Sequence, residues 1–395
     1  MYRKILKLST SVGLGQVLSL IFAPILARLY SPEEFGSYGL ILSLIALLSG
    51  VSTLRYEQAI LISENNERKD VLDTVVILNL FMSLLFSLIV MILEFLGYIT
   101  NLNSIWLMVG IFITSNYNVF RIYNLKIDNI SKVTVVDLIK SLILNMSQFA
   151  LSFSIIKKEG LIVGMIFSLL VPLLLYVKFS RWDINKAKFS KKVFFKYNKF
   201  AKYSLPEYFI NMLSQQLPIY YFYSIYDAYS VGLYVFADKI VRIPVQFLSK
   251  SVYQVICKEE NLSFCQYFIK PTLMLSVVSL IVFIPIAIFG GDIVRIYLGE
   301  KWIDSGILIS YLCLWMSFAF IKSPSSAFLT KNMMQKEMFS LEFIGMLIKV
   351  STLVISSKYT DFTITVLCFC VASAITNLMY IVFVYFKGHK NEITA

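Results

Sequence analysis

Apolar residues in this chain occur in long blocks, most of about twenty residues, separated by short polar connections. A helix of that length spans the hydrocarbon core of a bilayer, and helices satisfy every backbone polar group in lipid. Twelve blocks can be drawn, at about 5–30, 36–62, 71–99, 104–123, 133–156, 160–180, 201–226, 230–256, 271–291, 303–321, 339–357 and 362–386. The blocks predict an all-α polytopic membrane protein with twelve transmembrane helices.

Composition excludes the soluble classes of protein. Hydrophobic residues make up 58% of the chain and charged residues 15%, whereas soluble domains average about 25% charged residues. A soluble enzyme, a secreted disulfide scaffold and a disordered chain are therefore excluded. The five cysteines form no CxxC pair and the only histidine is His389, so neither a metal nor another cofactor is predicted. The sequence has no phosphate-binding P-loop for ATP.

The positions of the basic residues predict the orientation of the helices. With the N-terminus inside, inner loops and tails hold 24 of the 36 basic residues and outer loops hold 5, which leaves 7 inside the apolar blocks. Cytoplasmic loops are enriched in lysine and arginine, so both termini are predicted to be cytoplasmic. The net charge of +12 follows from this bias, and no nucleic-acid partner is predicted.

The longest hydrophilic segment, residues 181–200, lies in the middle of the chain. We predict an N-lobe at 1–180 with spans 1–6, a cytoplasmic amphipathic linker at 181–200, and a C-lobe at 201–395 with spans 7–12. Lysines at positions 192, 196 and 199 follow helical spacing beside an apolar stripe. Such a helix would place its cations over anionic head groups. A plain linker is favoured over a regulatory site.

The two halves show a faint internal repeat. A shift of 196 residues aligns Tyr30 with Tyr226, Gly36 with Gly232, Tyr38 with Tyr234, and Gln58 with Gln254. The shift is about half the chain and places the first two spans on the seventh and eighth. Parallel repeats of this kind form two lobes, and their substrate site lies between the halves.

Seven basic residues lie inside the apolar blocks: Arg28, Arg55, Lys140, Lys239, Arg242, Lys250 and Lys349. Each would cost roughly 2.5–3.5 kcal/mol at the centre of the bilayer. They must therefore meet a partner, reach an interface or line a hydrated cavity. For Lys140, a pair with Asp137 three residues away is favoured, and Asp238 is a partner for Arg242 four residues away. Arg28 ends its span and can reach the outer interface.

A hydrated cavity is favoured for Arg242 and Lys349, and is as plausible as snorkelling for Arg55 and Lys250. Glu57 lies two positions from Arg55, so a continuous helix would point the two side chains to nearly opposite sides. A cavity lined by these cations would hold a phosphate or carboxylate, and the planar arginine fork suits phosphate. The predicted fold is thus two six-helix lobes around a central cationic cavity.

Two regions resemble a known family. The segments ARLYSPEEFGSYG at 27–39 and LRYEQAI at 54–60 resemble the opening of Wzx-type O-antigen flippases. These flippases belong to the multidrug/oligosaccharidyl-lipid/polysaccharide export superfamily. The segments VGLY at 231–234 and ADKIVRIP at 237–244 resemble the second-half signature of the same family.

The resemblance implies a flippase of the bacterial inner membrane. Its cargo would be an undecaprenyl-diphosphate-linked oligosaccharide, an O-antigen or capsular repeat unit, that alternating access moves from the inner to the outer leaflet. Further expected partners are membrane lipids and other polysaccharide assembly proteins. Four basic residues would contact the diphosphate or acidic sugars by this resemblance: Arg28, Arg55, Lys239 and Arg242.

Energy would come from an ion gradient or the membrane potential. Glu57, Asp137 and Asp238 are the candidate proton or sodium carriers, although each can instead neutralise a nearby cation. Two other functions compete. A membrane-embedded O-antigen polymerase or glycosyltransferase is disfavoured because every outer loop is short. A drug exporter of the same superfamily is disfavoured because the charges inside the spans are mostly basic.

Overall fold

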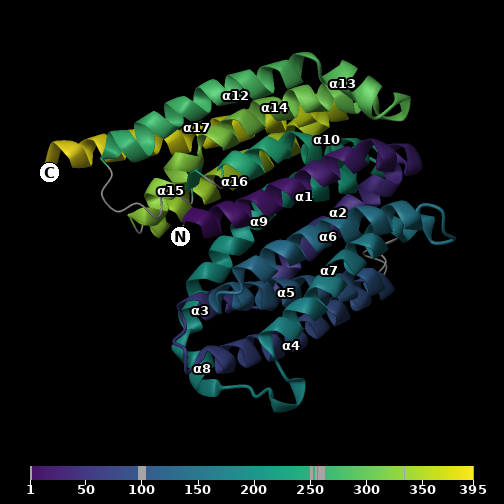
Figure 1. The fold of residues 1–395 in the computed structure, drawn as a ribbon. Helices are drawn as coiled ribbons and strands as arrows, with labels where there is room; N and C mark the ends of the chain where they lie inside the picture. Colours follow the sequence, from purple (N-terminus) through teal and green to yellow (C-terminus); the bar gives the residue numbers. More distant parts are fainter. Residues whose placement is uncertain are drawn as a thin grey trace. The chain divides into compact units, whose positions relative to one another are not determined.

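A computed structural model describes residues 2–96, 104–249, 252–253, 256, 263–332 and 334–394. All regular secondary structure in these ranges is helical (Figure 1). The chain forms two compact units. Unit 1 comprises Met1–Leu29 and Ser37–Leu213, and unit 2 comprises Tyr30–Gly36 and Ser214–Ala395. The boundary between the units at Leu213 and Ser214 lies inside a helix. The predicted boundary between the lobes lies in the linker 181–200, and the division into these two lobes stays a prediction.

Unit 1 is built around a layer of long helices. Its helices are α1 (Tyr2–Leu29), most of α2 (Pro32–Ser52), α3 (Glu57–Ile62), α4 (Arg68–Phe95), α5 (Ser104–Lys126), α6 (Ile130–Leu151), α7 (Gly160–Ser180), α8 (Lys191–Lys196) and the first part of α9 (Leu205–Ile225). Helix α6 packs between α1 and α7, while α5 packs on α7 and α4. One polar network of unit 1 lies between α5, α6 and α7.

Unit 2 has α14 at its centre. Its further helices are α10 (Ala228–Pro244), α12 (Lys270–Ile288), α13 (Gly290–Tyr297), α14 (Ser305–Ile321), α15 (Ser323–Lys331), α16 (Gln335–Tyr359) and α17 (Phe362–Thr394). Helix α14 packs against α10, α12 and α17, and α16 packs against α17. This arrangement buries one face of α10, which is mostly apolar, and one face of α17, which carries the buried polar residues Thr365, Ser373, Thr376 and Asn377.

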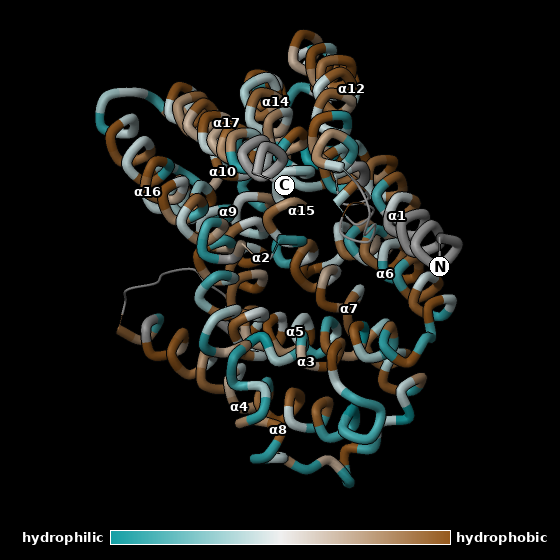
Figure 2. The backbone as a smooth tube through the Cα atoms, turned by 90° about the vertical axis from the view of Figure 1, so that its left-hand side faces the viewer, coloured by the Kyte–Doolittle hydropathy of each residue, from teal (hydrophilic) through white to brown (hydrophobic). Residues whose placement is uncertain are grey.

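Within the described residues, nine helical stretches are long and apolar enough to cross a membrane: Pro32–Ser52, Arg68–Ile92, Ile105–Lys126, Ile130–Leu151, Lys157–Ser180, Cys265–Ile288, Ser305–Lys331, Lys336–Tyr359 and Phe362–Gly388. In α4, α12 and α16 only 17% of the apolar window is buried, and Figure 2 shows long hydrophobic runs on α4 and α12. Exposed apolar surface of this extent belongs against lipid. The prediction of a multi-pass membrane protein is confirmed.

The count of twelve spans stays a prediction. The three remaining blocks fall on α1, α9 and α10, which do not reach the same length and apolarity. Of these, α1 has a shorter apolar stretch at Gly13–Leu29.

The prediction of one continuous helix over 36–62 is wrong. Leu54 and Arg55 adopt positive φ angles of 50° and 62° between α2 and α3, a conformation that a right-handed helix cannot contain. The hydroxyl of Thr53 donates to the Glu57 carboxylate at 2.6 Å. Polar side chains that bond locally in this way compete with the helical backbone ladder. The run of Ser52 and Thr53 was the sequence signal for the break.

The two aligned glycines meet at a helix crossing inside unit 2. A Cβ atom on Gly36 would lie 2.0 Å from the Ala228 carbonyl oxygen, and one on Gly232 would lie 1.7 Å from the Pro32 carbonyl oxygen. Only glycine permits so close a backbone approach. Because a shift of 196 residues also carries Pro32 onto Ala228, the two contacts are equivalent. The repeat is thus expressed in matching backbone contacts at the starts of α2 and α10.

Candidate functional site

The turn between α2 and α3 holds Arg55 against two partners. Its Nη1 donates to Glu57 Oε1 at 2.9 Å, and its guanidinium lies over the Tyr208 ring at 4.5 Å from the centroid. The prediction that Arg55 and Glu57 point to opposite sides is wrong, because the residues between the helices form a turn. The buried Nε of Arg55 donates to no partner among the described atoms. The turn therefore presents a guanidinium with donor capacity to spare.

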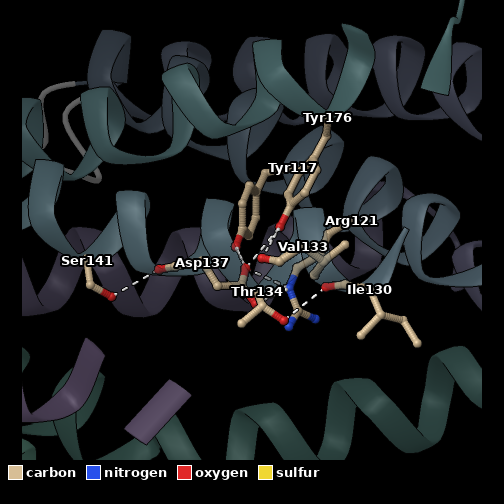
Figure 3. A network of polar contacts seen from close by, with 8 residues as sticks. All are labelled: Tyr117, Arg121, Ile130, Val133, Thr134, Asp137, Ser141 and Tyr176. Atoms are coloured by element: carbon tan, nitrogen blue, oxygen red, sulfur yellow. Dashed lines mark hydrogen bonds and ion pairs between the residues drawn. The ribbon is translucent and has the colours of Figure 1, made fainter. Parts of the chain in front are cut away.

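A second network lies between α5, α6 and α7 (Figure 3). Arg121 binds Asp137 through both Nε, at 3.0 Å from Oδ1, and Nη2, at 2.6 Å from Oδ2. The hydroxyls of Tyr117 and Tyr176 each donate to Asp137 Oδ1 at 3.0 Å. A buried carboxylate is stable in an apolar bundle only when it is neutralised and its lone pairs are bonded. Asp137 meets both conditions.

The predicted pair between Asp137 and Lys140 is wrong. The carboxylate is occupied by Arg121, whose fork approaches from the neighbouring helix with three hydrogen bonds, a geometry that one ammonium cannot match. Lys140 instead places its ammonium over the Tyr117 ring, 4.6 Å from the centroid. Arg121 is one of the 24 basic residues that the sequence places in inner loops and tails. Its position near the inner end of one block, opposite an acid in the next, was the available signal.

The predicted pair on α10 is confirmed. Arg242 binds Asp238 through Nη2 at 2.7 Å and Nε at 2.9 Å, and its guanidinium lies 5.5 Å from the centroid of the Trp315 ring. Lys239 is half-buried on the same helix, and no hydrogen bond or ion pair joins it to another described residue. Arg28 is exposed in the last turn of α1. Lys250 lies outside the described residues.

A third charged group lies between α9, α15, α16 and α17. Glu342 Oε1 accepts from Lys322 Nζ at 3.3 Å and from the Tyr380 hydroxyl at 3.0 Å. Lys349, buried on α16, donates to the Ser214 hydroxyl at 3.1 Å. Lys322 therefore pairs with the carboxylate of Glu342, whereas Lys349 has a neutral hydrogen-bond partner. Lys322, one of the 24 basic residues that the sequence places in inner loops and tails, is a further member of this site.

Basic groups outnumber acids in the two charged groups of unit 2, the one on α10 and the one around Glu342. Their basic members are Lys239, Arg242, Lys322 and Lys349, and their acidic members are Asp238 and Glu342. A surplus of cations in an apolar bundle attracts anions. In the part of the chain that the structure describes, no group of three or more His, Cys, Asp or Glu side chains could hold a metal ion. The chemistry open to these sites is anion binding and proton or cation exchange at carboxylates.

Comparisons with solved structures define a membrane transporter fold. The chain is similar to "Lipid II flippase MurJ, inward closed conformation", with a TM-score of 0.74 and 16% identity over 96% of this chain and 87% of that one. An inward-facing multidrug resistance MATE family transporter of the MOP superfamily gives 0.74 and 14% identity over 99% of each chain. A MATE structure in complex with MaL6 gives 0.67 and 12% identity over 98% and 96%.

A family match makes the assignment more specific. The family described as "Polysaccharide biosynthesis protein" matches residues 25–307. The chain belongs to this family. A search of curated proteins found no match. The predicted relation to a polysaccharide family is thus confirmed by the family match, and the solved structures share the fold of this chain.

Proposed function

We propose that this protein is a flippase for an undecaprenyl-diphosphate-linked oligosaccharide, an O-antigen or capsular repeat unit. It moves this cargo from the inner to the outer leaflet of the bacterial inner membrane by alternating access, with both termini in the cytoplasm. The supporting observation is the surplus of basic over acidic side chains in the two charged groups of unit 2, the one on α10 and the one around Glu342, in a member of the polysaccharide biosynthesis family. A drug exporter for organic cations would need the opposite surplus.

The cargo's diphosphate would be held by basic side chains at several depths. The proposed contacts are Arg28, Arg55, Lys239, Arg242, Lys250 and Lys349. Lys239 is available because it has no ion pair among the described residues, and Arg55 retains a free Nε. Arg242 holds a carboxylate through two hydrogen bonds, the geometry in which a guanidinium also binds phosphate. The diphosphate would replace Asp238 as the partner of Arg242.

Energy coupling follows from that exchange. The three proposed carriers, Glu57, Asp137 and Asp238, are each bonded to an arginine. When Arg242 turns to the cargo, Asp238 loses its neutralising cation in an apolar setting. A carboxylate in that state binds a proton or sodium ion to avoid an unpaired charge. Release of the cargo would return Arg242 to Asp238 and expel the bound ion.

The test is a gene deletion complemented with variants. Cells without the gene should accumulate undecaprenyl-linked repeat units on the inner leaflet, and the parent gene should clear them. Arg242→Ala should abolish surface polysaccharide at normal membrane abundance, while Arg295→Ala, at an exposed arginine of α13, should restore it fully. Repeat units that accumulate on the outer leaflet would point to a polymerase instead. Normal polysaccharide with Arg242→Ala would remove Arg242 from the mechanism.

Lys349 offers a test of charge against shape. Lys349→Arg keeps a donor and a positive charge beside Ser214, so export should stay well above that of Lys349→Ala at equal abundance. Lys→Ala leaves the Ser214 hydroxyl without its partner and removes one of two ammonium groups near Glu342. Surface polysaccharide quantified by gel is the measurement. Equal loss from both variants would show that the shape of the lysine matters, as well as its charge.

A further inference from the structure

Helix α8 is held against unit 1 by its apolar face. Val193 and Tyr197 are buried, one turn apart. The Phe194 ring stacks on Tyr56 with centroids 5.4 Å apart, and the Tyr56 hydroxyl donates to the Phe194 carbonyl at 2.8 Å. Ser190 caps the helix by accepting from the Val193 amide. The stripe that sequence reasoning described beside the lysines thus faces the protein.

The outer face of the same segment combines aromatic and basic residues. Phe195 is 67% exposed, Ile184 71% and Phe189 40%. Around them lie exposed lysines that form no ion pair with a described residue: Lys188, Lys191, Lys192 and Lys199. Of the acids nearby, Asp183 is paired with Lys186 and Glu67 with Lys196. The Lys196 ammonium holds the pKa of Glu67 below its usual range, so this carboxylate stays charged and paired at neutral pH.

Contacts with α4 place the segment at the level where a bilayer would begin. Trp182 Nε1 donates to Asp73 Oδ1 at 2.7 Å, and the Ser190 amide donates to Thr74 Oγ1 at 3.2 Å. Both acceptors lie in the second turn of α4, at the start of its long apolar, exposed stretch. We expect residues beside this turn to meet the head-group region, because α4 is long and apolar enough to span a bilayer.

We propose that residues 184–199 form a docking surface for the anionic phospholipid head groups of the inner leaflet. The lysines bind phosphate, and the exposed phenylalanines insert between the acyl chains. Basic amphipathic segments with exposed aromatic residues bind anionic membranes in this way. The mixed aromatic and basic face is what favours a membrane over a soluble protein as the occupant.

The chain offers a matched control, because it contains two adjacent lysine pairs of this kind. Lys191 and Lys192 lie on the proposed surface, which follows the C-terminal end of α7. Lys157 and Lys158 lie in the short turn before the N-terminal end of α7. The probe is phosphatidylglycerol, which is titrated onto the purified full-length protein in detergent and counted by native mass spectrometry. Phosphatidylcholine serves as the zwitterionic comparison.

K191Q/K192Q should weaken phosphatidylglycerol retention by about 25-fold, since each lysine near an anionic surface contributes about fivefold. K157Q/K158Q should leave retention unchanged, and millimolar inorganic phosphate should not displace the lipid from the parent protein. An equal effect of the two double variants, or no loss with K191Q/K192Q, would overturn the proposal. If K191Q/K192Q caused no loss of lipid, a soluble partner would remain as the ligand of this surface.

A second measurement locates the aromatic residues. Phe195→Trp adds a fluorophore to the four tryptophans of the parent protein. The added fluorescence is the difference between the variant and the parent, and lipids brominated on the acyl chain should quench it. Bromine carried only on a soluble phosphate ester should not quench it. Absence of quenching by brominated lipid would contradict insertion of Phe195. Neither measurement requires transport, so failure here leaves the proposed flippase function untouched.

Discussion

Asp137→Leu is expected to lower the free energy of unfolding by about 3–5 kcal/mol, the cost of leaving a buried ion without its partner. The variant would strand the Arg121 guanidinium, which makes three hydrogen bonds to the carboxylate, and would leave the Tyr117 and Tyr176 hydroxyls without their acceptor. Membrane abundance and the midpoint of thermal aggregation in detergent are the measurements. Both should fall sharply.

Two controls fix the interpretation. The exposed pair of Asp183 and Lys186 should matter little, because surface ion pairs contribute about 0–1 kcal/mol. Lys186→Ala should therefore keep abundance and the aggregation midpoint near those of the parent. Arg121→Leu combined with Asp137→Leu removes both charges and should recover much of the lost stability. If Asp137→Leu alone were as stable as the parent, the network would contribute nothing to the fold.

The double variant also separates a structural role of Asp137 from ion coupling. If Asp137 only neutralises Arg121, the double variant should recover export along with stability. If Asp137 carries a proton or sodium ion, stability should return while polysaccharide export stays low. Measuring export at matched abundance therefore decides between the two roles that the sequence left open for this residue.

Predictions from the sequence succeeded where one helix determines the geometry. Asp238 and Arg242 are four residues apart, and this spacing alone brings the side chains together on a helix. Asp137 and Arg121 are sixteen residues apart on different helices, and their contact depends on how α5 and α6 pack. A single sequence carries little information on that register. The pair was therefore missed, and the nearer Lys140 was assigned in place of Arg121.

The break before α3 shows a second limit. An apolar block of 27 residues, 36–62, is long enough for one tilted span, and hydrophobicity alone cannot reveal that Leu54 and Arg55 leave the helix. The consequence is functional, because the turn gives Arg55 the contacts with Glu57 and Tyr208 that a continuous helix would not provide. Local polar bonding at Thr53, rather than hydropathy, determines this candidate site.

The internal repeat was predicted from four weak identities. In the structure, the repeated residues form matching contacts where α2 crosses α10. Residues 30–36 belong to unit 2, where the Phe35 ring lies edge-on to Phe236 and Trp302 at centroid distances of 5.0 and 5.3 Å. Both helices begin with a side-chain cap, from Ser31 in α2 and Asp227 in α10, and these residues are also 196 apart. Equivalent caps and equivalent glycines therefore set the crossing.

Substitution of either glycine at this crossing is expected to be among the most damaging changes in the chain. A Cβ on Gly36 or Gly232 would overlap a backbone carbonyl oxygen, and backbone cannot rotate away as a side chain can. Overpacking of a core typically costs about 1–3 kcal/mol, and Gly232→Val should reach or exceed the upper end. Membrane abundance and monodispersity in detergent should both collapse, with a smaller loss for Gly36→Ala and Gly232→Ala.

Gly291 provides the matched control, because a Cβ there would meet nothing within 4 Å. Gly291→Ala should be neutral or slightly stabilising, since alanine is the better helix former by about 1 kcal/mol. Gly36→Ala and Gly232→Ala should combine to less than the sum of their separate losses, because one displacement of α2 from α10 relieves both overlaps. A Gly232→Ala protein as abundant and monodisperse as Gly291→Ala would show that the crossing is not so tightly packed.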